Sequence, residues 1–272
     1  MNRLHRSRQV QILSMLTEGV SICAISRITG VHKVTILKLL KETGQKCEAL
    51  LDSKMRDIPA KEIQADEIWT YVGKKQRKVR RSDGREVGDQ FIFVALEAET
   101  KLVPCYAVGK RDALTALRFM MDLQRRIRGR VQLTTDSFPP YRDAVERPFG
   151  ANVDYAQLIK SFRSNGVRRE TYSPGDIVDL VPITIMGYLY KRSISTSYIE
   201  RQNLTMRMQM RRLTQLTNGF SKKLDNLKAA LALHFAWYNL GRIHQTLRVT
   251  PAMEAGITDH VWTWEDILDW SN

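Results

Sequence analysis

The sequence predicts a mixed α/β protein, in which a short all-helical domain precedes a domain built on a five-stranded mixed sheet. Three observations support this class. Apolar residues recur at helical spacing between residues 6 and 44. Segments rich in β-forming residues follow one another between residues 62 and 108. After them, helical and strand-like segments alternate as far as residue 160, and helical periods return nearer the C-terminus.

The N-terminal region predicts three short helices, at residues 6–18, 22–29 and 33–42. Gly19 stops the first helix, Ser21 can cap the second, and Gly30 begins a tight turn before the third. A short helix, a glycine turn and a second helix form the helix-turn-helix pattern, whose second helix enters the major groove of DNA. The residues nearest to bases and phosphates would be His32, Lys33, Thr35 and Lys38. Three-helix bundles that bind no DNA share this outline, so that alternative stays open here.

The next segment supplies the strands of the second domain. Five strands are expected, at residues 62–72, 91–96, 102–108, 131–135 and 152–158. Asp112 can cap a helix that runs to about Ile127, and a short helix spans residues 141–146. Three successive strands, then helix, strand, helix, strand and a later helix are the order of a ribonuclease-H-like domain. In that fold the first and fourth strands are neighbours in the middle of a mixed sheet.

Three acidic residues are candidate metal ligands. Asp66 lies on the first strand, Asp136 ends the fourth, and Glu200 lies in the first turn of a helix that Ser197 can cap. The predicted fold brings the two aspartates face to face. Hard cations such as Mg²⁺ or Mn²⁺ prefer carboxylate oxygens, and two of them about 3.5–4 Å apart supply what phosphodiester cleavage needs. We therefore expect a site that holds two divalent ions.

Two questions about these acids stay open. Alternation along the first strand does not decide whether Asp66 or Glu67 points inward. The helix that carries Glu200 also presents Asn203, Arg207 and Arg211 on one face, a pattern that suits phosphate binding. The same pattern is common in amphipathic helices with a solvated ionic face.

The composition favours a nucleic-acid partner. Lys and Arg number 43 against 29 Asp and Glu, a net charge of +14, and such an excess attracts polyanions because bound phosphates release counterions. A membrane surface is the weaker alternative, because no basic amphipathic anchor with an aromatic face is present. No apolar run approaches the roughly 18 residues of a membrane span. The three cysteines form neither a zinc pattern nor a disulfide framework, so a reducing cytoplasm is expected.

Residues 161–196 interrupt the pattern with turn signals such as Asn165-Gly166 and Val181-Pro182. We expect an exposed insertion there, in which Asp176 and Asp179 are solvated and the basic residues are Arg163, Arg168, Arg169, Lys191 and Arg192. The expected organisation is a helix-turn-helix domain at 1–50, a linker at 51–61, a catalytic domain at 62–240 and a tail at 241–272. The tail is aromatic and acidic, and it would pack on the body or on a partner chain. His234 is expected to be a core histidine.

Three blocks of the sequence resemble the catalytic blocks of the DDE transposases of bacterial insertion sequences, most closely the insertion-sequence-one family. They are Asp66-Glu67-Ile68-Trp69-Thr70-Tyr71-Val72-Gly73, Thr134-Thr135-Asp136-Ser137-Phe138-Pro139-Pro140-Tyr141 and Ile199-Glu200-Arg201-Gln202-Asn203-Leu204-Thr205-Met206-Arg207. Phe220-Ser221-Lys222-Lys223 matches a further block. The resemblance implies a ribonuclease-H-like fold, Mg²⁺-dependent cleavage at element ends and transfer of the freed 3′-hydroxyl into target DNA. It carries over Asp66, rather than Glu67, as the first acid.

A transposase of this kind would bind double-stranded terminal repeats through its helix-turn-helix and would act as a homodimer or higher oligomer near the bacterial nucleoid. Phosphates near the metals would contact Lys160, Arg201, Asn203, Arg207 and Arg211, and flanking DNA would contact Lys74, Lys75 and Arg77. The chain departs from the family in lacking a cysteine zinc finger and in carrying a basic hairpin at 74–88. Two other functions fit parts of the sequence, namely a non-enzymatic helix-turn-helix regulator and a ribonuclease-H-like nuclease without strand transfer.

Overall fold

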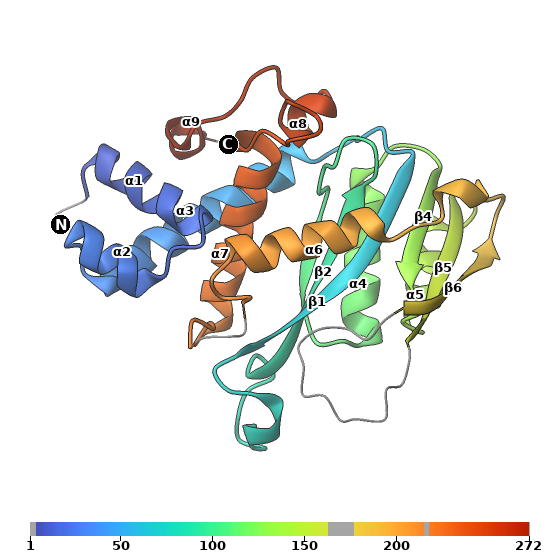
Figure 1. Ribbon diagram of the computed structural model, residues 1–272, viewed down its shortest axis with the longest axis horizontal. Helices are drawn as coiled ribbons and strands as arrows, with labels where there is room; N and C mark the ends of the chain where they lie inside the picture. The colour runs from blue at the N-terminus through green and yellow to red at the C-terminus, as the bar shows by residue number, and fades with distance from the viewer. Residues whose placement is uncertain (1–3, 163–176, 215–217, 272) are drawn as a thin grey trace.

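One mixed sheet forms the centre of the computed structural model, which describes residues 4–162, 177–214 and 218–271 (Figure 1). Its strands lie in the order β3-β2-β1-β4-β5-β6. They are β1 (Glu62–Val72), β2 (Gly88–Glu97), β3 (Tyr106–Gly109), β4 (Val131–Asp136), β5 (Val153–Phe162) and β6 (Ile177–Met186). β1 pairs antiparallel with β2 and parallel with β4, and β4 pairs parallel with β5. The ribonuclease-H-like arrangement, with the first and fourth strands adjacent, is confirmed.

The described part of the chain contains six strands in this sheet, where the sequence predicted five. The additional strand, β6, pairs antiparallel with β5 and lies within the segment 161–196, in which an exposed insertion but no strand was expected. The sequence did not predict this strand because Pro182 and the other turn signals of the segment are unfavourable in regular strands. An edge strand tolerates proline, because some of its N–H groups face away from the sheet. The expected basic residues Arg163, Arg168 and Arg169, and Asp176, lie outside the described residues, whereas Lys191 and Arg192 are exposed in a short 3₁₀ turn.

Helices cover both faces of the sheet. α4 (Ala113–Arg126) and α5 (Tyr141–Phe149) pack together on one face, and α6 (Ser197–Gln209) crosses β1 and β2 on the other (Figure 1). Asp112 caps α4 as expected, because its carboxylate accepts a hydrogen bond from the Thr115 N–H. Phe93 of β2 contacts the rings of Phe119 and Tyr141, so an aromatic core joins the sheet to α4 and α5. Most residues of β1 and β2 are buried between these helices.

The N-terminal helices are α1 (Arg6–Thr17), α2 (Ile22–Thr29) and α3 (Lys33–Lys54). Ser21 caps α2 through the Ala24 N–H, and Gly30 adopts a left-handed φ of 69° in the turn before α3. The expected end of the third helix near Glu42 is wrong. α3 continues because its later turns pack on α7 (Leu224–Ala236). A Cβ on Gly44 would come within 2.6 Å of the Ala229 Cα, so only glycine permits this approach.

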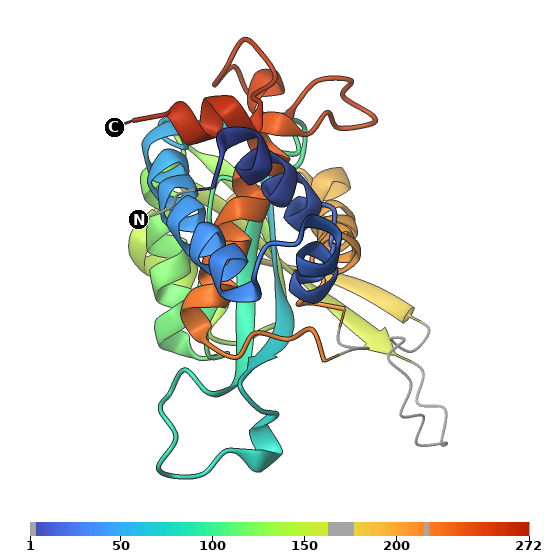
Figure 2. The same ribbon diagram turned by 90° about the vertical axis from the view of Figure 1, so that its left-hand side faces the viewer.

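The C-terminal segment packs on the body of its own chain. α7 continues into a π-helical turn (Trp237–Gly241), followed by α8 (Pro251–Glu254) and α9 (Trp264–Asp269). α9 lies beside α1 and α3 (Figure 2), where Arg6 pairs with Asp269. The Trp264 ring stacks on Trp237 with centroids 4.8 Å apart. Among the helices of the described residues, none is both long enough and apolar enough to cross a bilayer.

Candidate metal centre and nucleic-acid interface

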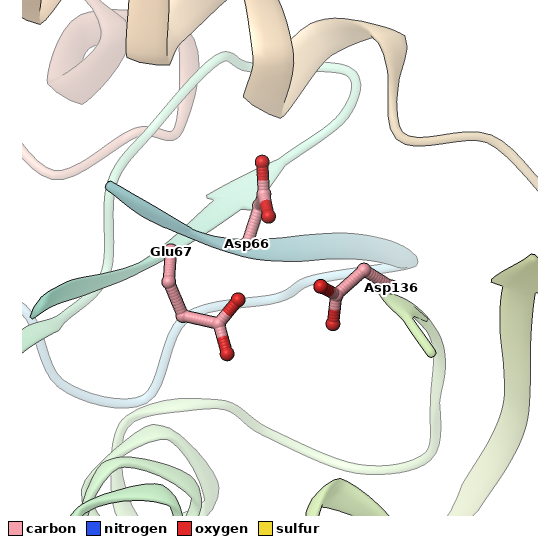
Figure 3. A group of neighbouring side chains, drawn as sticks. All are labelled: Asp66, Glu67 and Asp136. Atoms are coloured by element: carbon pink, nitrogen blue, oxygen red, sulfur yellow. The ribbon is translucent and has the colours of Figure 1, made fainter. Parts of the chain in front are cut away.

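Three carboxyl groups come together at the middle of β1 and the end of β4. β1 and β4 pair in parallel from Glu62 opposite Gln132 to Ala65 opposite Thr135, so Asp66 and Asp136 are the next residues on the two strands. One carboxylate oxygen from each of Asp66, Glu67 and Asp136 lies within 4.8 Å of the others. In Figure 3, Asp66 and Glu67 project from opposite sides of β1, and the Asp136 carboxyl group turns toward that strand. Both acids of β1 therefore contribute to the cluster.

Burial and mutual repulsion change the titration of this cluster. Burial, followed by the negative charge of Asp136, raises the pKa of Asp66 to about 6. The same two causes raise the pKa of Glu67 to about 8, although the Arg111 guanidinium opposes them. Like charges in a poorly solvated position favour the protonated forms. A bound cation would relieve this repulsion.

The donor atoms fit a divalent ion. The Glu67 side chain is only 3 % exposed, and its Oε1 atom has no hydrogen-bond partner among the described residues. The buried Tyr141 hydroxyl faces Glu67 closely enough to lower the pKa of that carboxyl, but no hydrogen bond of normal geometry joins them. An unpaired buried acceptor is costly. Three carboxylates form the hard oxygen set that Mg²⁺ and Mn²⁺ prefer, and the orphaned oxygen is free to serve as a ligand.

Arg111 is a site residue that the sequence analysis missed. Its Nη2 atom lies 3.2 Å from Asp136 Oδ2 and 3.7 Å from Glu67 Oε2. The guanidinium also lies over the Phe138 ring, 4.2 Å from the centroid, so it is held between an aromatic face and the acids. The residue follows β3 and directly precedes the cap of α4. Nothing in its local sequence distinguishes it from the other surface arginines.

α6 is docked onto β1 at two points beside Asp66. The buried Gln64 Oε1 atom accepts hydrogen bonds from the backbone N–H groups of Tyr198 (2.9 Å) and Ile199 (3.1 Å). Three residues into the helix from Glu200, the Asn203 amide donates to Asp66 Oδ2 at 2.8 Å. The expected capping role of Ser197 is wrong, since Thr196 is the N-cap position and forms no side-chain capping bond. A strand residue satisfies the helix N-terminus instead.

Glu200 lies beside the three-acid cluster rather than within it. Its Oε1 atom accepts hydrogen bonds from Lys160 Nζ and Thr196 Oγ1, both at 2.5 Å. Its charge contributes to raising the pKa of Asp66, so the two carboxyl groups are electrostatic neighbours. Lys160 comes from β5, and its ammonium is thus engaged with the helix acid. Glu200 is placed on the same side of α6 as Asn203, because residues three apart share a helix face.

The residues expected to contact DNA are distributed over several surfaces. His32, Lys33, Thr35 and Lys38 are exposed at the start of α3, where His32 caps the helix through the Val34 N–H. Lys75 and Arg77 are exposed on the β1–β2 connection, which projects from the body (Figure 2). Lys74, in the same connection, pairs with Asp83 at 2.8 Å.

The residues expected to hold phosphates along α6 do not lie on one continuous exposed face. Arg201 is exposed, whereas Asn203 is buried against Asp66. Burial lowers the pKa of Arg207, and the charge of Asp66 opposes that effect, which places this guanidinium near the acids. α6 ends at Gln209, so Arg211 lies beyond the helix in an exposed turn.

Solved structures of transposase complexes are among those that the chain resembles. No protein-family model and no curated protein sequence matches the chain. The Mos1 strand transfer complex is 16 % identical over 57 % of this chain and 59 % of that chain, with a TM-score of 0.25. The Mos1 transposase paired-end complex with left transposon end is 16 % identical over 57 % and 60 %, with a TM-score of 0.26. The piggyBac transposase synaptic complex with hairpin DNA is 10 % identical over 86 % and 66 %, with a TM-score of 0.37. The chain thus spans about three fifths of the Mos1 chains.

Proposed function

We propose that this protein is a metal-dependent DNA transposase of the DDE type, related to those of bacterial insertion sequences, in which Asp66, Asp136 and Glu200 hold two divalent ions. One observation carries the proposal. Asp66 and Asp136 converge where the parallel pairing of β1 with β4 ends, and Asn203 ties the helix of Glu200 to Asp66. Carboxylates from two strands and a helix are a suitable ligand set for Mg²⁺ or Mn²⁺.

The protein groups around the acids would position DNA for cleavage. Bound divalent ions would supply an activated nucleophile and neutralise the charge that develops on the phosphate. Asn203 orients the Asp66 carboxylate through its amide hydrogen bond. Lys160 would leave Glu200 to bind a phosphate, and Arg207 would hold a second phosphate next to Asp66. Arg201 on α6 and Arg211 in the turn that follows the helix would contact further phosphates.

The remaining basic surfaces would hold DNA away from the cleavage site. The exposed start of α3 would contact the terminal repeats through His32, Lys33, Thr35 and Lys38, and the β1–β2 connection would contact flanking DNA through Lys74, Lys75 and Arg77. Two element ends must be joined in concert, so the active form would be a homodimer or a higher oligomer on DNA. The helix-turn-helix would be residues 1–50, and the catalytic domain residues 62–240.

Cleavage of the element's own terminal DNA by the purified protein tests this function. We expect cleavage with Mg²⁺ or Mn²⁺ and none with EDTA. Asp66→Asn, Asp136→Asn and Glu200→Gln should each lower the cleavage rate by at least about a hundredfold, as expected when a group that stabilises transition-state charge is lost. DNA binding should persist in all three variants. Asp179→Asn is the matched control, because Asp179 is an exposed acid on β6.

Two outcomes would change the proposal. A variant that still cleaves at the native rate would remove its residue from the site, and binding without any metal-dependent cleavage would favour a regulator. A joining assay with a pre-cut 3′-hydroxyl end separates a transposase from a nuclease. Cleavage without joining would leave only the nuclease.

A further inference from the structure

A cavity lies between the N-terminal helices and α7, and none of the clustered acids lines it. It has a volume of about 440 Å³, within the range of small-ligand sites. Apolar side chains from four different parts of the chain form its walls, among them Leu16, Val20, Leu37, Met210 and Leu233. Part of the lining therefore belongs to the helix-turn-helix, and part follows the end of α6.

The charges around this cavity have one sign. Five cationic residues contribute to the lining, namely Lys33, Arg211, Arg212, Lys222 and Lys223, and none of its described lining residues is acidic. Arg212 is partly buried and donates a hydrogen bond to Ser221 Oγ at 2.9 Å. Apolar walls with a cationic rim select a ligand that combines an apolar body with negative charge.

A buried polar atom in the same lining also requires a partner. His234 is 3 % exposed, and its Nε2 atom has no hydrogen-bond partner among the described residues. The side chain lines the cavity together with the amide of Asn226. Burial of an imidazole nitrogen without a partner costs free energy. The ligand that completes the site should therefore carry hydrogen-bonding atoms on its apolar body.

We propose that this cavity receives an unpaired base of bound DNA, while its cationic rim holds the adjoining phosphates. The inference rests on the proposed DNA-processing function, because two of the cationic lining residues, Lys33 and Arg211, are also candidate DNA contacts on α3 and after α6. A nucleotide has a flat, weakly polar base with hydrogen-bonding edges and a charged phosphate. Proteins bind such bases in pockets that pair with the base edge, and they bind unpaired strands through cationic grooves.

The test compares two single strands that have the same charge. A fluorescein-labelled twelve-residue oligothymidylate is titrated against an abasic strand of equal length by fluorescence anisotropy, in EDTA. We expect the native protein to bind the oligothymidylate about tenfold more tightly, the effect of one well-held base. Equal affinities would overturn the proposal.

Variants of cavity residues test whether the preference for a strand that carries bases arises in this cavity. Ala230→Phe fills the cavity from α7, so the ratio of the two affinities should fall to about one, while affinity for the abasic strand stays unchanged. Ala230→Ser is the matched control and should keep the native ratio. His234→Leu removes the base-edge partner and should lower the ratio without filling the space. A folded Ala230→Phe variant that retains the preference would show that bases bind elsewhere.

Photocrosslinking and competition with decanoate test the proposal independently of these variants. If Ala230→Phe does not fold, photocrosslinking of a strand that contains 5-iodouracil should label peptides from the two parts of the native chain that line the cavity, residues 16–40 and 210–234. Labelling elsewhere would overturn the proposal. Decanoate that stabilises the native protein without displacing the oligothymidylate would identify an apolar-acid site instead. No step requires a metal or cleavage. A failed base preference would leave the transposase proposal standing, and lost cleavage would leave the base preference intact.

Discussion

The acids of the sheet and the acid of the helix are held in different ways. Asp66 and Asp136 follow directly from the β1–β4 register, so their convergence is fixed by backbone pairing. Glu200 reaches the same region only because α6 is docked by the side chains of Gln64 and Asn203, and its carboxylate is occupied by Lys160. The comparison indicates that strand pairing fixes the positions of Asp66 and Asp136 in the candidate site. The position of Glu200 depends on side-chain contacts of α6 and can therefore be adjusted.

The largest difference should appear in metal affinity. Asp136→Asn should weaken Mn²⁺ binding by more than about a hundredfold, beyond the range seen for residues that act through a ligand. Glu200→Gln should weaken it by only about tenfold. Isothermal titration calorimetry measures both, and Asp179→Asn serves as the unaffected reference. Equal losses in the two variants would mean that the helix acid is as permanent a ligand as the strand acids.

An intermediate effect is expected from the docking residue Gln64. Gln64→Leu leaves two backbone N–H groups at the start of α6 without their acceptor, which should lower the free energy of unfolding by about 1–3 kcal/mol. Misplacement of Glu200 should also slow cleavage by about tenfold. Denaturant unfolding and single-turnover cleavage measure the two effects.

Gln132→Leu provides the matched control for that variant. Gln132 lies on the neighbouring strand, where its side chain accepts a hydrogen bond from the Tyr190 N–H and donates one to the Tyr190 carbonyl, outside α6. It should lose stability without a specific loss of cleavage rate. If both variants slow cleavage equally, the placement of Glu200 does not depend on this docking.

The smallest effect concerns Lys160. Lys160→Met removes the ammonium that occupies Glu200, and a partly exposed ion pair is worth no more than about 1 kcal/mol. Mn²⁺ affinity should therefore rise by about twofold to fivefold. Lys61→Met, which breaks the exposed Lys61–Glu99 pair on the surface, should leave affinity unchanged. A fall in affinity in Lys160→Met would mean that Lys160 supports the metal site rather than competing with it.

The sequence was sufficient for features that depend on local pattern. Apolar runs gave β1, β2 and β4, and the caps Ser21 and Asp112 marked their helices, because these signals act over a few neighbouring residues. β6 escaped detection because an edge strand can contain Pro182, and the full length of α3 escaped because packing on α7 sustains its last turns.

The site could be predicted in part for the same reason. Asp66 and Asp136 follow from strand order, which the pattern of elements encodes. Glu67 was visible as a carboxyl in an apolar strand, but its buried environment depends on Tyr141 and Arg111, which join the site only in the folded chain. Gln64 was hidden for a similar reason, because its role is to cap a helix that begins more than 130 residues later.

α3 has a mechanical consequence. Its exposed first turns and its buried last turns belong to one unbroken rod of 22 residues, about 33 Å long at 1.5 Å per residue. Because α3 has no break, its exposed N-terminal end cannot rotate independently of the C-terminal end that packs on α7. If the exposed end holds the terminal repeat, the angle at which that duplex approaches the carboxylates is decided when the chain folds, and changing it would require moving whole subunits.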